Sequence, residues 1–261
     1  MTEASQPVLE QHFDNRVATL TLNRPDKFNA LSEELLHELQ TALSAIGKDD
    51  SIAVVIIAAR GRAFCAGHDL KQMRGNHSET YYRTLFAQCS GMMQTIRKIP
   101  QPVIASVQGL ATAAGCQLVA TCDLALAANT AQFAVSGINL GLFCSTPSVA
   151  LSRNINNKRA LEMLLTGEFI DANTAVEFGL INHSVDPDQL QQQTRALADR
   201  IAEKPKSARA IGKSMFYAQL PKDLNDAYEY AAGVMALNMM EAETVDAVDS
   251  FLNKKRINSS N

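Results

Sequence analysis

Short apolar runs alternate with longer amphipathic segments over most of the chain. Residues 52–59 and 103–107 are short runs dominated by Val, Ile and Ala. This length and composition favour strands that are buried on both faces of a parallel sheet. Apolar positions recur at helical spacing in residues 35–46, after Ser32, which is a good N-cap candidate. Strands separated by helices need crossover connections, so the pattern predicts an α/β fold.

The two ends of the chain differ in pattern. Residues 8–12 and 17–22 are predicted as the strands of a hairpin that turns at Asp14-Asn15. After Asn157, strand signals nearly vanish. Further expected elements are a strand at 124–127 and helices at 80–98, 113–122, 159–165, 172–177, 189–202, 207–217, 224–240 and 243–251. We therefore expect a body, residues 1–200, and a helical region, residues 201–261, that packs on the body or on a neighbouring subunit.

Composition and charge exclude several classes of function. The 261 residues include 24 Lys plus Arg and 27 Asp plus Glu, which leaves no basic surplus for tracking a polynucleotide. No apolar run approaches the length of a membrane span. Five cysteines lack CxxC spacing, and His12, His37, His77 and His183 are scattered. We expect reduced thiols, no metal and a cytoplasmic location, or the mitochondrial matrix if a presequence precedes this chain.

Two small-residue segments are the strongest candidates for chemistry. Residues 61–70 and 107–118 each run from a predicted strand through a loop into a predicted helix. Small side chains at such a junction let a ligand approach backbone N–H groups near a helix N-terminus. If the two loops face each other, they place two N–H donors around one oxygen, which is an oxyanion hole. The alternative is that the small residues serve close packing alone.

The chain resembles the crotonase (enoyl-CoA hydratase/isomerase) superfamily over nearly its whole length. The resemblance lies in five motifs in the family order: Asn23-Arg24-Pro25 with Asn29-Ala30-Leu31, Ala63 to Leu70, Gln108 to Leu118 with Cys122-Asp123-Leu124, Asn139-Leu140-Gly141, and Leu165 to Glu168 with Gly179-Leu180-Ile181. It implies a spiral of ββα units followed by a C-terminal helical trimerisation region. A homotrimer or a dimer of trimers is the expected assembly.

The resemblance also implies the ligand and the residues that bind it. The ligand is an acyl-CoA thioester, with CoA as part of the substrate and no separate cofactor. Its carbonyl is expected between the backbone N–H groups of His68 and Ala114. The expected CoA channel is lined by Lys27, Ala30, Ala66, Asp69 and Leu70, with Phe251 and Lys254, from this or a neighbouring subunit, at the adenine and phosphate end. Arg62, Lys71 and Arg74 form a basic edge that either contacts CoA phosphate or is simply solvated.

The family's hydratases use two glutamates to move protons, and this chain has neither. Their positions are Gln117 and Gly137 here. Because a positioned acid or base contributes roughly 10²–10⁴ in rate, efficient hydration by that route is not expected. Restoring Gln117→Glu and Gly137→Glu together would test whether only the carboxylates are missing.

Other residues leave alternatives open. His68 is either a base or a bystander beside its own N–H, and Cys144 is either a nucleophile or a buried inert thiol. Asp69 is interpreted as a helix cap. The turn Ala66-Gly67-His68-Asp69 also resembles that of methylmalonyl-CoA decarboxylase. The alternatives are therefore an acyl-CoA decarboxylase, a thioesterase, or a non-catalytic acyl-CoA binding protein.

Overall fold

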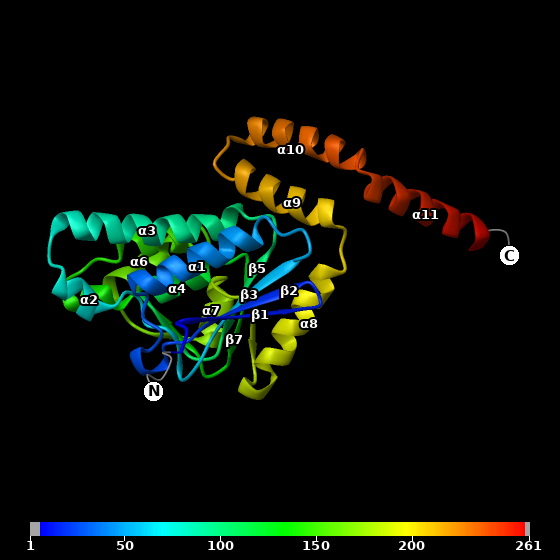
Figure 1. Ribbon diagram of the computed structural model, residues 1–261. Helices are drawn as coiled ribbons and strands as arrows, with labels where there is room; N and C mark the ends of the chain where they lie inside the picture. Colours follow the sequence, from blue (N-terminus) through cyan, green and yellow to red (C-terminus); the bar gives the residue numbers. More distant parts are fainter. Residues whose placement is uncertain (1–5, 259–261) are drawn as a thin grey trace. The chain divides into compact units, whose positions relative to one another are not determined.

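Figure 1 shows the computed structural model of the chain, which describes residues 6–258 and the side chains of residues 6–253. The chain forms two compact units, Met1–Asp199 and Arg200–Asn261. The boundary falls inside helix α8, Leu190–Ala202. Within the described residues, both β-sheets belong to the first unit and the second is helical.

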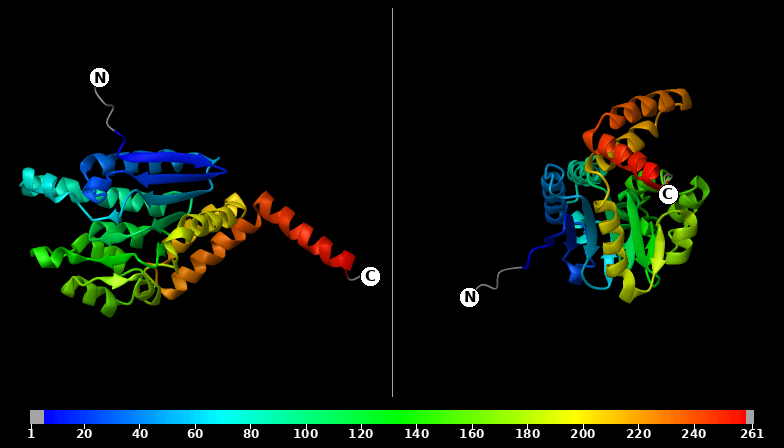
Figure 2. Two further views of the ribbon diagram at one scale, coloured as in Figure 1. Left: turned by 90° about the horizontal axis from the view of Figure 1, so that it is seen from below. Right: turned by 90° about the vertical axis from the view of Figure 1, so that its right-hand side faces the viewer.

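The larger sheet has six strands in the order β1-β2-β3-β5-β7-β10. They are β1 Leu9–Asp14, β2 Val17–Leu22, β3 Val54–Ala59, β5 Val103–Val107, β7 Leu124–Ala128 and β10 His183–Val185. Neighbouring strands pair in parallel, except β1 with β2. Figure 2 shows this sheet from two further sides. The hairpin turns at Asn15 and Arg16, with φ of 45° and 66°, one residue later than expected.

A smaller sheet of four short strands has the order β4-β6-β8-β9. They are β4 Ala63–Cys65, β6 Leu110–Thr112, β8 Gln132–Ala134 and β9 Ile170–Asp171. Along the chain, one strand of the larger sheet is followed by one strand of the smaller sheet and then by a helix, three times over. These are the expected ββα units, and sequence periodicity could not reveal the short strands because they have only two or three residues.

The helices that the sequence predicts in the first unit begin and end close to the expected positions, and α5, Ser145–Leu151, is a further helix that the sequence does not predict. The helices of this unit are α1 Glu33–Ile46, α2 Leu70–Gly75, α3 Glu79–Lys98, α4 Ala114–Thr121, α5, α6 Asn157–Thr166, α7 Ala172–Phe178 and α8, with 3₁₀ turns η1 Pro25–Lys27, η2 Ser136–Leu140 and η3 Pro187–Gln189. The Ser32 hydroxyl caps α1 by accepting from the backbone N–H of Leu35. The buried face of α1 packs beside α3 (Figure 1).

The core of the first unit fills the space between these layers. Phe64 and Phe133, from β4 and β8, are its largest fully buried side chains. All five cysteines are buried, and none forms a disulfide bond. Burial of thiols in an apolar core raises their pKa, to about 12 for Cys65 and Cys116, because desolvation disfavours the thiolate.

The second unit contains three helices among its described residues. They are α9 Lys206–Gln219, α10 Leu224–Met239 and α11 Ala242–Asn258. α9 and α10 lie side by side (Figure 1), and the Glu243 carboxylate accepts from the backbone N–H and hydroxyl of Ser207. Many apolar side chains of α10 are exposed, Tyr228 and Met235 among them. Across the described residues, no helix combines the length and apolar character that a membrane span requires.

Candidate active site

The first loop of the site follows β4 and is held by residues 28–31. Leu31 donates its N–H to the carbonyl of Gly67 and accepts from Asp69, at 2.8 and 3.2 Å. In this parallel bridge the N–H of His68 points away from Leu31. Below it, the fully buried Asn29 amide donates to the carbonyls of Arg60 and Ala63 at 2.8 and 2.7 Å. The backbone of the loop is therefore fixed from one side.

Asp69 ends this loop as a structural residue. Its carboxylate caps α2 by accepting from the N–H of Gln72 and forms an ion pair with Arg24 at 3.0 Å. Partial burial alone would raise the pKa of Asp69, but the Arg24 hydrogen bond and the α2 backbone hold it below the ordinary value. Asp69 is therefore an ionised cap, as its place before a helix suggested.

The second loop connects β6 to α4 and closes against the first. Ala113 has φ 51° and ψ −120°, a backbone conformation that is energetically unfavourable for alanine. A Cβ at Gly115 would overlap the carbonyl of Cys65, and one at Gly67 would lie 3.3 Å from the backbone N of Ala114. Gly67 itself has φ +93°, which glycine adopts without strain. The two loops therefore touch along their backbones.

This contact brings the N–H groups of His68 and Ala114 to neighbouring positions. Ala114 is the first residue of α4, where an N–H has no intrahelical acceptor. Neither N–H donates a hydrogen bond to any described residue. Two uncommitted backbone donors in neighbouring positions, one of them at a helix N-terminus, are suited to a developing negative charge on oxygen.

The donors open into a largely apolar pocket of about 220 Å³. Its lining residues are Ala66, His68, Leu70, Met73, Phe86, Ala113, Ala114, Ser136, Gly137, Leu140, Leu142, Phe143, Cys144, Ser145, Thr146 and Pro147. This set has no carboxylate, and its only titratable side chains are His68 and Cys144. Among the described residues, no group of His, Cys, Asp and Glu gathers as a metal site would require.

The His68 ring lines this pocket and is largely buried. Neither ring nitrogen has a hydrogen-bond partner among the described residues, and the ring meets Phe86 edge-on with centroids 5.4 Å apart. Burial lowers the pKa of His68 to about 4, and an interaction with the Leu31 backbone offsets this only in part. The imidazole is therefore neutral at pH 7.

Gly137 and Cys144 face each other at another wall of the pocket. A Cβ at Gly137 would lie 2.6 Å from the carbonyl oxygen of Leu142 and 2.7 Å from the sulfur of Cys144. Burial raises the pKa of the Cys144 thiol, and the backbone N–H of Gly137 lowers it only in part. Backbone and sulfur thus occupy the space that a Gly137→Glu side chain would enter, so a missing carboxylate is not the only difference at this position.

Gln117 lies outside the lining of this pocket. It is buried on α4 and lines a second cavity, together with residues of α3 and α5. Its Oε1 atom has no hydrogen-bond partner among the described residues. Thr146 lines both the second cavity and the first.

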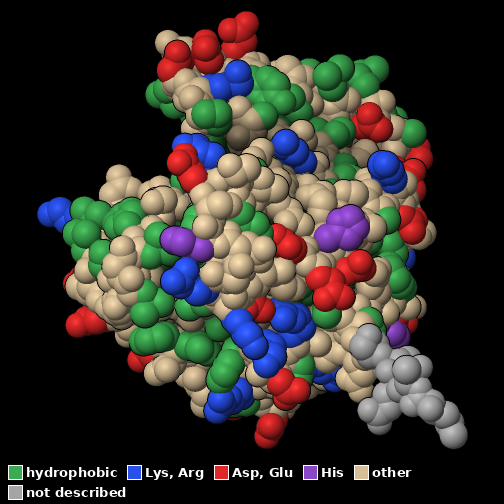
Figure 3. All heavy atoms as spheres, turned by 60° about the vertical axis from the view of Figure 1, so that its left-hand side comes forward, with side chains coloured by type: hydrophobic (Ala, Val, Ile, Leu, Met, Phe, Trp, Pro, Cys, Tyr) green, Lys and Arg blue, Asp and Glu red, His purple; other side chains and the backbone are tan. Residues whose placement is uncertain are grey.

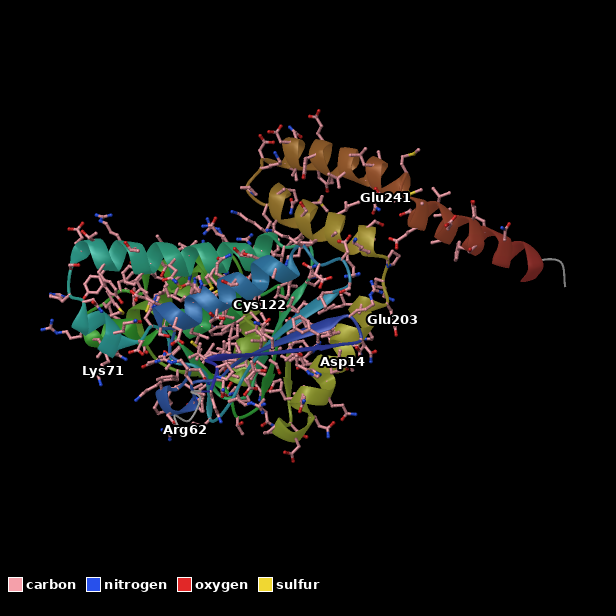
Figure 4. The ribbon with its side chains drawn as sticks, in the orientation of Figure 1. Asp14, Arg62, Lys71, Cys122, Glu203 and Glu241 are labelled. Atoms are coloured by element: carbon pink, nitrogen blue, oxygen red, sulfur yellow. The ribbon has the colours of Figure 1, made fainter. Side chains whose placement is uncertain are left out.

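The residues expected along CoA lie mostly at the surface. Ala30 is partly exposed, whereas Lys27 and Lys71 are exposed and line neither cavity. In Figure 4, Arg62 and Lys71 point outward on the α2 side of the first unit. Figure 3, which brings that side forward, shows Lys and Arg side chains gathered beside exposed hydrophobic ones. Phe251 is an exposed residue of the second unit, and the side chain of Lys254 lies outside the described residues.

Several pocket residues escaped the sequence analysis. Phe86 and Met73 lie on helices, and an apolar side chain on a helix is expected from the sequence to belong to the hydrophobic core. Leu140 ends η2, Leu142 and Phe143 follow it, and all three are more than a third exposed. In the sequence, the only signal of a binding surface at this loop is the run of apolar residues on both sides of Gly141.

Two sheets built from successive ββα units define a crotonase-fold protein. The chain belongs to the enoyl-CoA hydratase/isomerase family, whose model matches residues 12–260.

Individual relatives agree with this assignment. The mitochondrial enoyl-CoA hydratase domain-containing protein 3 of Rattus norvegicus is 42% identical over 92% of this chain and 80% of its own. The crystal structure of an enoyl-CoA hydratase from Mycobacterium smegmatis is 53% identical, with TM-score 0.94 over 95% of this chain and 97% of that one. The human enoyl-CoA hydratase domain-containing protein 3 structure is 41% identical, with TM-score 0.92 over 95% and 98%.

Proposed function

We propose that the protein binds an acyl-CoA thioester whose carbonyl oxygen accepts hydrogen bonds from the backbone N–H groups of His68 and Ala114. The observation that carries this proposal is the backbone contact between the two loops, with Gly67 against the nitrogen of Ala114. Family membership supports a CoA thioester as the ligand. The apolar pocket beside the donors fits the thioester and the first carbons of an acyl group.

The rest of CoA would leave the pocket past Ala66 and Leu70 toward the exposed basic edge. Arg62, Lys71 and Arg74 are exposed there, and their charge suits the CoA phosphates. Lys27, Ala30 and the loop before Asp69 would flank the route. Phosphate contacts of this exposed kind weaken with salt.

Hydration through two carboxylates is not the reaction this pocket favours. Adding water to an enoyl thioester needs a group that activates water and one that protonates the α-carbon. No carboxylate lines the pocket, and Gln117 and Gly137 offer no proton acceptor near pH 7. We therefore expect crotonyl-CoA to be hydrated far more slowly than by a two-glutamate hydratase.

Decarboxylation is the second candidate, favoured by the lack of a base in the pocket. When an α-carboxylated acyl-CoA loses CO₂, the electron pair of the breaking C–C bond forms the enolate, so no residue has to remove a proton. The two N–H groups would stabilise the enolate oxygen, and water would supply the proton to the α-carbon. The neutral, apolar surroundings of His68 and Phe86 would favour loss of the carboxylate's charge.

A thioesterase that uses Cys144 has less support. A thiol attacks as the thiolate, and burial raises the pKa of Cys144. A binding protein without catalysis would bind the same thioesters and release no product. Mass spectrometry after long incubation with crotonyl-, malonyl- and butyryl-CoA separates these candidates, since each reaction leaves a product of different mass.

The carbonyl stretch of a bound thioester tests the proposed hole directly. Donors that polarise a C=O bond lower its stretching frequency, so butyryl-CoA labelled with ¹³C at the carbonyl should show a downshift on binding. Gly67→Ala places a methyl group 2.9 Å from the Cβ of Ala113 and should abolish the shift. Gly75→Ala, where nothing lies within 4 Å, is the matched control. Binding without a downshift in the unmodified protein would refute the hole.

The exposed apolar side chains of α10 support self-association. Leu224, Tyr228, Met235 and Leu237 are each about 70% exposed in the single chain, which is unusual for a monomer. A homotrimer or a dimer of trimers would cover them. Sedimentation equilibrium would show the mass of three or six chains, and a monomer at micromolar concentration would contradict the expectation.

A further inference from the structure

The second cavity lies among three helices and has a polar end. Its volume is about 210 Å³. Met93 of α3 and Val149 of α5 form part of its apolar wall, and Gln117 of α4 lines it as well. Arg97 and Arg153 also line it, and no Asp or Glu does.

The second cavity adjoins the first pocket at Thr146. Thr146 lines both spaces, and Ala114 and Gln117 lie on successive turns of α4. Thr146 lies in the first turn of α5, and Arg153 lies two residues beyond the end of that helix. A chain that starts at the paired N–H groups and passes Thr146 therefore approaches the space that Arg97 and Arg153 line.

Gln117 and Arg153 indicate that this space receives a polar ligand group. Gln117 is only 5% exposed, and its Oε1 atom has no protein partner among the described residues. This oxygen is an acceptor, so a donor such as water satisfies it, and the preference for a negative charge rests on the arginines. The guanidinium of Arg153 donates to the carbonyl of Val149 and forms no ion pair with a described carboxylate. Its remaining donors suit a carboxylate.

We propose that the second cavity takes the distal part of the acyl chain and that Arg97 and Arg153 select an acyl group ending in a carboxylate. The substrate class is thus an ω-carboxyacyl-CoA, the CoA thioester of a dicarboxylic acid. This inference rests on the proposed thioester site. It differs from a purely structural role, in which both arginines would only satisfy carbonyls near the ends of α3 and α5 and would not discriminate between acyl groups.

The test compares two CoA thioesters that differ only at the far end of the chain. Hexanoyl-CoA and adipoyl-CoA have six acyl carbons each, and only adipoyl-CoA ends in a carboxylate. Isothermal titration of the full chain with each should show roughly tenfold tighter binding of adipoyl-CoA, the gain expected of a hydrogen bond to a charged group. The preference should decrease as salt rises.

Single substitutions then test whether Arg97 and Arg153 produce the preference for adipoyl-CoA. Arg153→Gln and Arg97→Gln should each bring the two affinities close together and leave the hexanoyl-CoA affinity unchanged. Arg83→Gln is the matched control, because Arg83 lies on α3, is 79% exposed and pairs with Glu79. Arg153 is exposed as well, so its variant is expected to fold.

Each outcome decides a different claim. Equal binding of the two thioesters would overturn the inference and leave the proposed thioester site intact. A preference for adipoyl-CoA that survives both arginine substitutions would have the same consequence. Failure of either thioester to bind would overturn the proposed function itself, and with it this inference.

Discussion

The buried imidazole of His68 makes stability depend on pH in a predictable way. Its ring nitrogens have no partner among the described residues, and burial lowers its pKa from 6.5 to about 4. Because the folded-state pKa is the lower one, the unfolded chain takes up the proton first as the pH falls. This group's contribution to the free energy of unfolding is therefore full above about pH 6.5 and is lost between about pH 6.5 and pH 4.

The size of the effect follows from the pKa difference. Each pKa unit corresponds to about 1.4 kcal/mol, so the shift from 6.5 to about 4 amounts to about 3 kcal/mol. Most of this, about 2 kcal/mol, should be lost between pH 7 and pH 5.

Urea unfolding followed by circular dichroism at pH 7 and pH 5, at one protein concentration, measures this loss. His68→Gln cannot take up the proton, so its free energy of unfolding should fall by about 2 kcal/mol less over the same interval. His37→Gln, at an exposed position on α1, is the matched control and should behave like the unmodified protein. If His68→Gln and the unmodified protein show the same pH dependence, the imidazole is not desolvated as described.

Three further outcomes follow from the packing around the site. Gly137→Glu should destabilise the fold by roughly 1–3 kcal/mol, because the new side chain overpacks against Leu142. The variant should also fail to hydrate crotonyl-CoA, and a rise in that activity would show that the pocket can hold the glutamate. Asn29→Ala should cost roughly 3 kcal/mol, because it leaves the carbonyl of Arg60 and the N–H of Arg24 unpaired; urea unfolding would measure it, and a loss below 0.5 kcal/mol would count against it. Gly91→Ala, in α3 with open space around it, should gain about 0.5–1 kcal/mol in thermal unfolding, and a loss would point to an unseen contact.

Long elements could be predicted from the sequence because their patterns are strong. The apolar spacing of α1 and the cap at Ser32 define that helix within one residue. β3 stands out as a short run of β-branched residues. The strands of the smaller sheet could not be found this way, since a three-residue strand such as β6 is too short to show a period of two.

The candidate site divides along a similar line. The two loops could be located, because small residues between a strand and a helix leave a visible pattern around Gly67 and Ala114. The state of His68 could not be predicted, since its low pKa comes from burial in a pocket that also contains Phe86, eighteen positions away in the chain on α3. The position of Gln117 in a second cavity likewise depends on how α3 and α5 pack against α4.

The interlocked backbones at Gly67 and Gly115 have a consequence for how such a protein changes over generations. Both donors of the proposed hole are main-chain groups, so no substitution at His68 or Ala114 other than proline deletes either one. Mutation can therefore exchange the proton-transferring residues around the carbonyl while the device that polarises it persists. A lineage can lose one reaction and acquire another without passing through a protein that no longer holds its ligand.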